Sequence, residues 1–296
     1  MTTDHSVIQA EPSLIDKVAS NSRAVATNRT AQLGLVLLTP VFVGLVFAPF
    51  IAPHGFAEQH LIDRFVGPGS TYLLGTDHLG RDLFSRVLYG GRTSLYIGIL
   101  ATVIGASIGI PIGISSGYEG GYVDEFVMRV MDMMLSIPAL LLALLILVTL
   151  SATATNAALA IGISTVPKIA RVARSATLDV KDQEYITAAV ARNESRPYIW
   201  GGIILPNITS ALLVEIFIRI GFAIMTGAAL SFLGLGAQPP KPEWGRMIAI
   251  ARIHIFQTPW MLLWPSIALA LTVLGFNLLG AGLRDALDPR ETSREL

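Results

Sequence analysis

The sequence contains no cysteine among its 296 residues. This absence excludes disulfide bonds, catalytic thiolates and cysteine-ligated metal sites. Charged residues are also scarce, at 14 % of the chain, whereas an ordinary soluble domain has roughly 25 %. Lys and Arg together number 21, as do Asp and Glu. The chain therefore lacks the excess of positive charge that indicates nucleic-acid binding.

The sequence also lacks the motifs of common catalytic and nucleotide-binding sites. No phosphate-binding loop of the form Gly-x-x-x-x-Gly-Lys-Ser/Thr occurs. The five histidines form no cluster with carboxylates, and we interpret Asp77, beside His78, as a turn residue rather than a metal ligand. No nucleophile-base pair indicates an intramembrane enzyme. We expect this chain to have no catalytic residue and to bind no metal and no cofactor.

Apolar residues dominate, at 52 % of the chain with a mean hydropathy of +0.61. A helix needs about 20 apolar residues to cross the hydrocarbon core of a membrane. Stretches of that kind predict an all-α integral membrane protein with about six spans. The predicted spans are Gln32–Ala52, Leu95–Gly117, Met133–Leu150, Ala157–Arg174, Ala211–Leu233 and Trp260–Leu283. The fourth span is the least apolar, because Lys168 and Arg171 fall in its last turns.

The spans divide the chain into four parts and suggest an orientation. These parts are an N-terminal tail (1–30), the first span with an extracytoplasmic segment (31–94), the main transmembrane domain (95–285) and a C-terminal tail (286–296). The side of the membrane that holds both termini would carry 13 Lys and Arg residues, against 7 on the other side. Because positive loops stay inside, we expect a multi-pass protein of the cell (inner) membrane with both termini cytoplasmic.

Two features of the second span and of the residues that precede it are informative. Leu83, Phe84, Val87 and Leu88 lie on one face of a helix over 82–89, which predicts an amphipathic helix at the outer surface. Small residues then recur along the span and favour close packing of helices within one bundle. They are Gly98, Ala101, Gly105, Ala106, Gly109 and Gly113.

The segment from Asp179 to Asn207 predicts two short helices between the fourth and fifth spans. The first has one apolar face, formed by Tyr185, Ile186, Ala189 and Val190. Asn193 follows it and tolerates the left-handed conformation that ends a helix. Pro206 is predicted to end the second helix. Residue patterns alone leave two interpretations open, an amphipathic loop on the membrane surface or a knob that docks into a groove on a partner protein.

This segment resembles the EAA motif of ABC-importer permeases, Glu-Ala-Ala, then Gly, then Ile-Leu-Pro. Ala188 and Ala189 match its alanines, and residues 204–206 match its end. Thr187 stands where the family often has Glu, and Asn193 where it has Gly. The resemblance implies that a coupling helix contacts the ATPase through Tyr185, Ile186, Thr187, Ala188, Ala189, Val190, Asn193 and Pro206.

Three further stretches are similar to the C-type permease subunit of dipeptide and oligopeptide importers. They are Leu74–Arg86, Leu230–Pro240 and Gly282–Arg290. The resemblance implies a type I ABC-importer permease fold that forms half of a translocation path. A sister permease would form the other half, two ATP-binding subunits would hold ATP and Mg, and an extracytoplasmic binding protein would deliver the substrate. Nickel and glutathione importers carry nearly the same motifs, so nickel, glutathione or another small solute is the alternative substrate.

Glu215 and Arg219 lie four residues apart within the fifth span. They are expected to form a local ion pair, and intramembrane charges usually face a cavity rather than lipid. We therefore expect both to line the translocation path. A secondary carrier is the rival class of transporter, but the predicted spans hold a single acidic residue and no inverted repeat.

Overall fold

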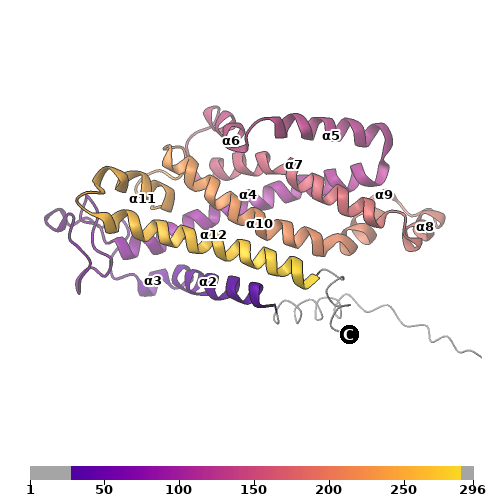
Figure 1. The fold of residues 1–296 in the computed structure, drawn as a ribbon. Coiled ribbons are helices and arrows are strands. Elements are labelled where there is room, and N and C mark those ends of the chain that lie inside the picture. The colour runs from indigo at the N-terminus through magenta and orange to yellow at the C-terminus, as the bar shows by residue number, and fades with distance from the viewer. Residues whose placement is uncertain (1–27, 288–296) are drawn as a thin grey trace, which may run out of the picture.

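The computed structural model describes residues 28–287, and the predicted tails lie almost wholly outside these residues. The described part is a bundle of helices without a β-strand (Figure 1). Its elements are α2 (Arg29–Val46), α3 (Ala48–Ile51), η1 (Leu61–Asp63), α4 (Leu83–Glu119), α5 (Gly121–Ser136), α6 (Ala139–Val148), α7 (Ala154–Val180), α8 (Glu184–Ala191), α9 (Arg196–Tyr198), the π-helix η2 (Ile199–Ile204), α10 (Leu205–Phe232), α11 (Trp244–Ala251), η3 (Arg252–His254) and α12 (Pro259–Leu287).

Four helices are long and apolar enough to cross a membrane: α2, α4, the continuous helical segment Arg196–Phe232, and α12. They correspond to the first, second, fifth and sixth predicted spans, but α2 ends at Val46, and the short helix α3 holds most of the remaining residues of the first predicted span. The predicted fourth span lies in α7, whose 27 residues extend about 40 Å at the rise of an α-helix. Lys168 and Arg171 lower the hydropathy of α7. This helix therefore has the length of a span without the apolar composition of the other four.

The predicted third span, Met133–Leu150, is a broken helix rather than a straight one. Its residues are divided between α5 and α6, which meet at an angle of 87° and count as a fifth span only when taken together. The break falls at Ile137, whose backbone is extended (φ −91°, ψ 127°). Pro138 follows it, and a proline disfavours the helical conformation of the residue before it.

The predicted helix over 82–89 is present, but its residues form the first turns of α4 rather than a helix of their own at the surface. Asp82 caps α4 by accepting a hydrogen bond from the Ser85 N–H at 2.8 Å. The helix then runs without interruption past Arg92, so the domain boundary drawn between residues 94 and 95 falls inside it. Arg92 donates to the carbonyl oxygens of Leu45 at 2.6 Å and Val46 at 3.0 Å, at the end of α2.

Glycines of α4 bring its backbone against α7, as the small-residue pattern predicted. Gly105, Gly109, Gly113 and Gly117 recur every four residues along the face of α4 that meets α7, and the last three leave no room for a Cβ beside the facing helix. At Gly109 a Cβ would lie 2.8 Å from the Val166 carbonyl oxygen. The contact joins two helices of the same bundle, so the tight-packing interpretation is confirmed.

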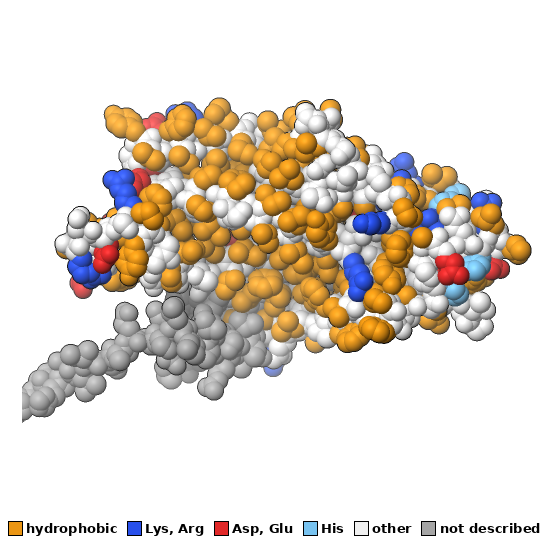
Figure 2. Space-filling view, turned by 180° about the vertical axis from the view of Figure 1, so that it is seen from behind, with side chains coloured by type: hydrophobic (Ala, Val, Ile, Leu, Met, Phe, Trp, Pro, Cys, Tyr) orange, Lys and Arg blue, Asp and Glu red, His pale blue; other side chains and the backbone are white. Residues whose placement is uncertain are grey.

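The two ends of the bundle differ in structure. One end carries α8, and α2 begins and α12 ends toward that side (Figure 1); Gly282 of α12 lies directly against Ala31 of α2. We call it the α8 end. The opposite end, the loop end, consists of residues 52–82 and 234–258. Hydrophobic side chains cover much of the middle of the bundle, while charged and histidine side chains gather mainly toward its ends (Figure 2), as expected for helices surrounded by lipid.

Candidate functional site: the α8 segment, the Glu215 pocket and the loop end

The α8 helix ends in a Schellman motif centred on Asn193. The Asn193 N–H donates to the Val190 carbonyl oxygen at 2.9 Å, and the Glu194 N–H donates to the Ala189 carbonyl oxygen at 3.2 Å. Asn193 itself has a φ of +57°. The predicted left-handed residue at this position is therefore confirmed.

The conformation of Asn193 leads to a test by substitution. Asn193→Val should cost about 1–3 kcal/mol, because a β-branched residue resists positive φ. It should loosen the turn and swing α8 away from its position. Asn193→Gly should keep the wild-type structure, because glycine adopts positive φ readily. Limited proteolysis around residues 192–195 measures both variants, and equal resistance of the two would contradict this role of the turn.

The apolar face of α8 is half covered by the chain itself. Ile186 is 2 % exposed and Ala189 is fully buried. They belong to one apolar cluster together with Ala173, Ile199, Ile204 and Ile208 of α7, η2 and α10. Both interpretations drawn from the sequence left this face free to meet a membrane or a partner protein, but Ile186 and Ala189 are covered by the chain itself. The reason is that α7, η2 and the start of α10 supply the apolar side chains that cover this side of α8.

The side chains of α8 that remain exposed point away from this cluster. Val190 is 52 % exposed and Tyr185 is 38 % exposed. Thr187 and Ala188 are exposed as well. The α8 helix is thus fixed to the bundle by one face, and its other face is exposed.

Pro206 does not end the second helix, contrary to the prediction. It lies in the first turn of α10, and the helical path is continuous from α9 through η2. Proline has no N–H to donate to the preceding turn. A wider π turn precedes it instead, in which the Leu205 N–H donates to the Trp200 carbonyl oxygen. The Asn207 side chain donates to the Ile203 carbonyl oxygen at 2.8 Å.

Glu215 and Arg219 form the expected ion pair on α10. Glu215 is buried, and the Arg219 guanidinium lies 5.6 Å from the centre of the Phe222 ring. Glu215 also lines a pocket of about 510 Å³ between α7, α10 and α12. Asp179 and Arg284, which lie at the α8 end, line the same pocket. The structure therefore brings Glu215 to a cavity, with Arg219 beside it as its ion-pair partner.

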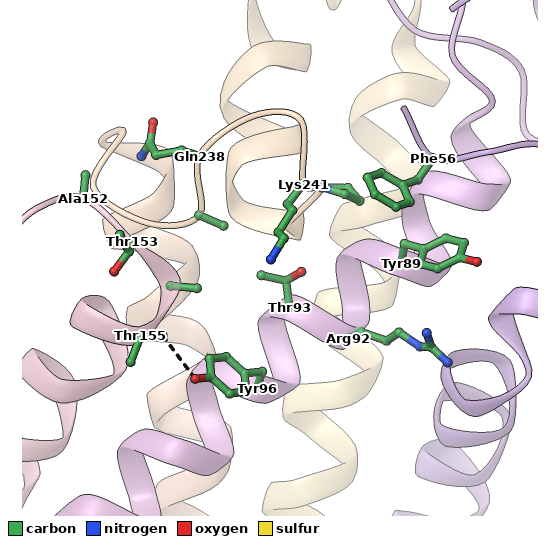
Figure 3. A pocket seen from close by; sticks show the side chains of 13 residues that line it. Phe56, Tyr89, Arg92, Thr93, Tyr96, Ala152, Thr153, Thr155, Gln238 and Lys241 are labelled. Carbon is green, nitrogen blue, oxygen red and sulfur yellow. Dashed lines mark hydrogen bonds between the residues drawn. The ribbon is translucent and has the colours of Figure 1, made fainter. Parts of the chain in front are cut away.

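A second cavity, at the loop end, has no counterpart among the predicted site residues (Figure 3). This groove of about 680 Å³ is lined by α4, by the start of α7 and by the segment 237–242. Tyr96 and Thr155 bridge it through a hydrogen bond of 3.1 Å between their hydroxyl groups. Its side chains come from segments far apart in the sequence, so no local pattern could indicate it.

The loop end is held together by a buried carboxylate. Asp77 Oδ2 accepts from Arg81 Nη2 at 2.7 Å and lies 3.4 Å from Arg86 Nε, and all three residues are buried. Asp77 Oδ1 accepts from the backbone N–H groups of Leu79 and Arg81, so Asp77 is also the turn residue that was predicted. Burial raises the pKa of the Asp77 carboxyl, but the hydrogen bond from Arg81 and the two positive charges outweigh it and hold the pKa below its ordinary value.

Removing this carboxylate should destabilise the loop end. Asp77→Asn leaves two buried guanidinium groups without their counter-charge, which typically costs about 3–5 kcal/mol. Because the folded-state pKa of Asp77 is lowered, its contribution is complete above the ordinary carboxyl pKa of about 4 and is lost only in stronger acid. The deficit should therefore be the same at about pH 5 and about pH 8.

Thermal unfolding of the protein in nanodiscs measures the effect of Asp77→Asn. Glu58→Gln is the matched control, because Glu58 lies in the same loop with its side chain 48 % exposed. We expect the control to unfold within a degree or so of the wild type, since exposed pairs contribute about 0–1 kcal/mol. Equal stability of the two variants would contradict a structural role for Asp77.

Comparison with known proteins places the chain among transport proteins. Residues 109–293 match the family described as binding-protein-dependent transport system inner membrane component. The dipeptide transport system permease protein DppC of Alkalihalophilus pseudofirmus is 40 % identical over 266 residues, which cover 90 % of this chain and 88 % of that protein. The di/tripeptide transport system permease protein DppC of Pseudomonas aeruginosa is 37 % identical over an alignment of 299 positions, which covers 98 % of each chain.

Two further similarities complete the comparison. The glutathione transport system permease protein GsiD of Escherichia coli is 42 % identical over 262 residues, covering 88 % of this chain and 86 % of that protein. A chain of the MetNI methionine ABC transporter, solved in inward-facing conformations, superposes with a TM-score of 0.57 at 18 % identity and covers 69 % of this chain and 97 % of that one. The chain belongs to the family of binding-protein-dependent transport system inner membrane components and is a membrane permease of an ABC importer.

Proposed function

We propose that the chain is one of two permease subunits of an importer for di- and oligopeptides. The similarity to dipeptide, di/tripeptide and glutathione permeases supports a peptide-like substrate. A sister permease completes the translocation path, and two separate subunits bind ATP and Mg, since this sequence has no phosphate-binding loop. The observation that carries the proposal is α8, a short helix fixed to the bundle on one face and exposed on the other.

In this proposal α8 transmits the closure of the ATPase dimer to the transmembrane helices. Thr187, Ala188 and Val190 contact a groove on the ATPase, while Ile186 and Ala189 tie α8 to α7 and α10. Because Ile186 and Ala189 are buried among side chains of α7, η2 and α10, a displacement of α8 should move those helices with it rather than being absorbed locally. The helix α10 carries Glu215, so the same movement reaches the wall of the cavity that Glu215 lines.

The proposed orientation puts the α8 end in the cytoplasm and the loop end outside the cell. The bias of positive charge supports it, and so does the position of the chain ends: the start of α2 and the end of α12 lie against each other toward the α8 end. Both termini are then cytoplasmic. An extracytoplasmic binding protein delivers the substrate to the loop end.

Uptake by the reconstituted complex tests the substrate class. The permease pair, its ATPases and the cognate binding protein are placed in proteoliposomes with ATP on the ATPase side. We expect ATP-dependent accumulation of a labelled dipeptide in preference to nickel. Glutathione uptake without dipeptide uptake would favour the alternative substrate, and uptake driven by an ion gradient without ATP would indicate a secondary carrier.

The ion pair of α10 should matter for uptake more than for assembly. Replacing both Glu215 and Arg219 by Gln removes both charges. Exchanging the two residues keeps the net charge but reverses the order of the negative and positive charges along α10. Both changes should lower uptake at least tenfold, about 1.4 kcal/mol in the rate-limiting barrier, while the amount of purified complex stays near wild type.

The matched control is the exposed pair on α5, Glu125 and Arg129, which has the same four-residue spacing and side chains about 70 % exposed. Its double Gln variant should transport normally, because exposed pairs contribute little. If the Glu215 and Arg219 variants also transport normally, these residues do not line the path.

A further inference from the structure

A second, smaller pocket at the loop end has a lining rich in positive charge. It measures about 250 Å³ and lies between the segment that carries Arg81 and Arg86 and the segment 239–250. Lys241, Arg246 and His78 line it as well, and Glu243 is the single acidic residue of the lining. Arg81 is 7 % exposed and Arg86 is 5 % exposed. These guanidinium groups are thus held in place by the fold rather than lying free on the surface.

The carboxylates nearby leave this positive charge incompletely balanced. Within the described part of the chain, Asp77 is the one carboxylate that forms an ion pair with Arg81 or with Arg86. The Glu243 carboxylate accepts from the backbone N–H groups of Gly245 and Arg246 and from the Ser94 hydroxyl, and makes no ion pair among residues 28–287. Glu243 therefore caps α11, and Lys241 and Arg246 have no ion-pair partner in the part of the chain that the structure describes.

Two buried nitrogen atoms of the lining also lack partners. Arg246 Nε and His78 Nδ1 are buried without a hydrogen-bond partner among residues 28–287. The Arg246 guanidinium is held by one neutral acceptor, Gln238 Oε1, at 3.2 Å. A buried donor left unpaired costs about 1–3 kcal/mol, so a ligand that accepts hydrogen bonds here would relieve that cost. Guanidinium groups bind carboxylates with matching geometry.

We propose that this pocket binds the carboxylate of an acidic side chain on the extracytoplasmic substrate-binding protein. The inference rests on the proposed function, which places the loop end outside the cell. A free peptide would bring an ammonium group together with its carboxylate, and the lining offers that ammonium no unengaged acidic partner. An Asp or Glu side chain of a protein brings a carboxylate alone, which suits a lining of arginines and prolines.

The test measures binding of the cognate binding protein to the complete complex in nanodiscs by biolayer interferometry. Arg246→Gln removes the least constrained guanidinium of the pocket, and Arg246→Lys keeps its charge. Arg64→Gln is the matched control, because Arg64 is an exposed cation of the same end that does not line the pocket. We expect Arg246→Gln to weaken binding at least tenfold, mainly through faster dissociation. Arg246→Lys should recover part of the loss, and Arg64→Gln should change the affinity less than threefold.

The outcomes separate this inference from the function on which it rests. If the binding protein fails to bind the wild-type complex, the proposed function is wrong. If it binds the wild type, Arg246→Gln and Arg64→Gln equally, only the carboxylate pocket is wrong. A labelled dipeptide is added to the same complexes without binding protein. Dipeptide binding that requires Arg246 would overturn the assignment to a protein side chain.

Discussion

Gly113→Leu should leave almost no assembled permease in the membrane. A Cβ at this position would lie 2.6 Å from the Ala173 Cβ and 2.9 Å from the Arg174 backbone nitrogen, and it would meet the Ala170 carbonyl oxygen more closely still. These are atoms of a facing helix, which cannot turn aside as a flexible side chain would. Overpacking a core costs about 1–3 kcal/mol, and a leucine against backbone should exceed that range.

The amount of complex extracted from the membrane measures the effect, and we expect it to fall more than tenfold. Ser107→Leu is the control, because Ser107 lies on the same helix with its side chain exposed and bonded only to its own helix, at the Ile104 carbonyl oxygen. It should assemble normally. If Gly113→Leu assembled as well as Ser107→Leu, the close contact of α4 with α7 would not exist in the membrane.

Ala189→Asp should release α8 from the bundle and abolish uptake. Ala189 is fully buried in the cluster that joins α8 to α7 and α10. A carboxylate placed there has no cation in the cluster to pair with, and burying an unpaired charge costs several kcal/mol. The helix can avoid that cost only by leaving its place, so ATP hydrolysis by the partner subunits should continue without uptake.

Ala188→Asp is the comparison for this variant, because Ala188 is exposed on the opposite face. It should weaken contact with the ATPase but leave α8 in place. Limited proteolysis distinguishes the two: Ala189→Asp should be cleaved rapidly around residues 192–195, and Ala188→Asp should resist as the wild type does. Equal resistance of both variants would contradict the attachment of α8 to the bundle through Ala189.

The membrane-spanning helices were predictable because each depends on a local property. A stretch of about 20 residues without charge is enough to indicate a span, and α2, α4 and α12 each lie over such a stretch. The helix α10 contains Glu215 and Arg219, but the residues around them are apolar enough to indicate a span as well. The third span was predicted less accurately, as one straight helix over 133–150. Its length and hydropathy indicate a span but not the bend between α5 and α6, which follows from Pro138.

The errors at α8 and the loop end have a different cause, since both depend on contacts between distant segments. The spacing of the apolar residues of α8 predicts one apolar face, formed by Tyr185, Ile186, Ala189 and Val190. It does not indicate that distant segments of the same chain cover Ile186 and Ala189. Arg86 had the position of a surface residue on a short helix. Its burial beside Asp77 depends on how residues 52–82 fold over the end of α4, which no periodicity encodes.

The most direct test of the central claim is a crosslink between α8 and the ATPase. The chain has no cysteine, so a single introduced cysteine reports one position. Val190→Cys places it on the exposed face of α8, and Ile62→Cys places it at the loop end, where Ile62 is 99 % exposed. With a short bifunctional reagent and the assembled complex, we expect the cysteine at position 190 to join the ATP-binding subunit and the one at position 62 to leave it unlinked. A crosslink to that subunit from position 62, with none from position 190, would contradict the account.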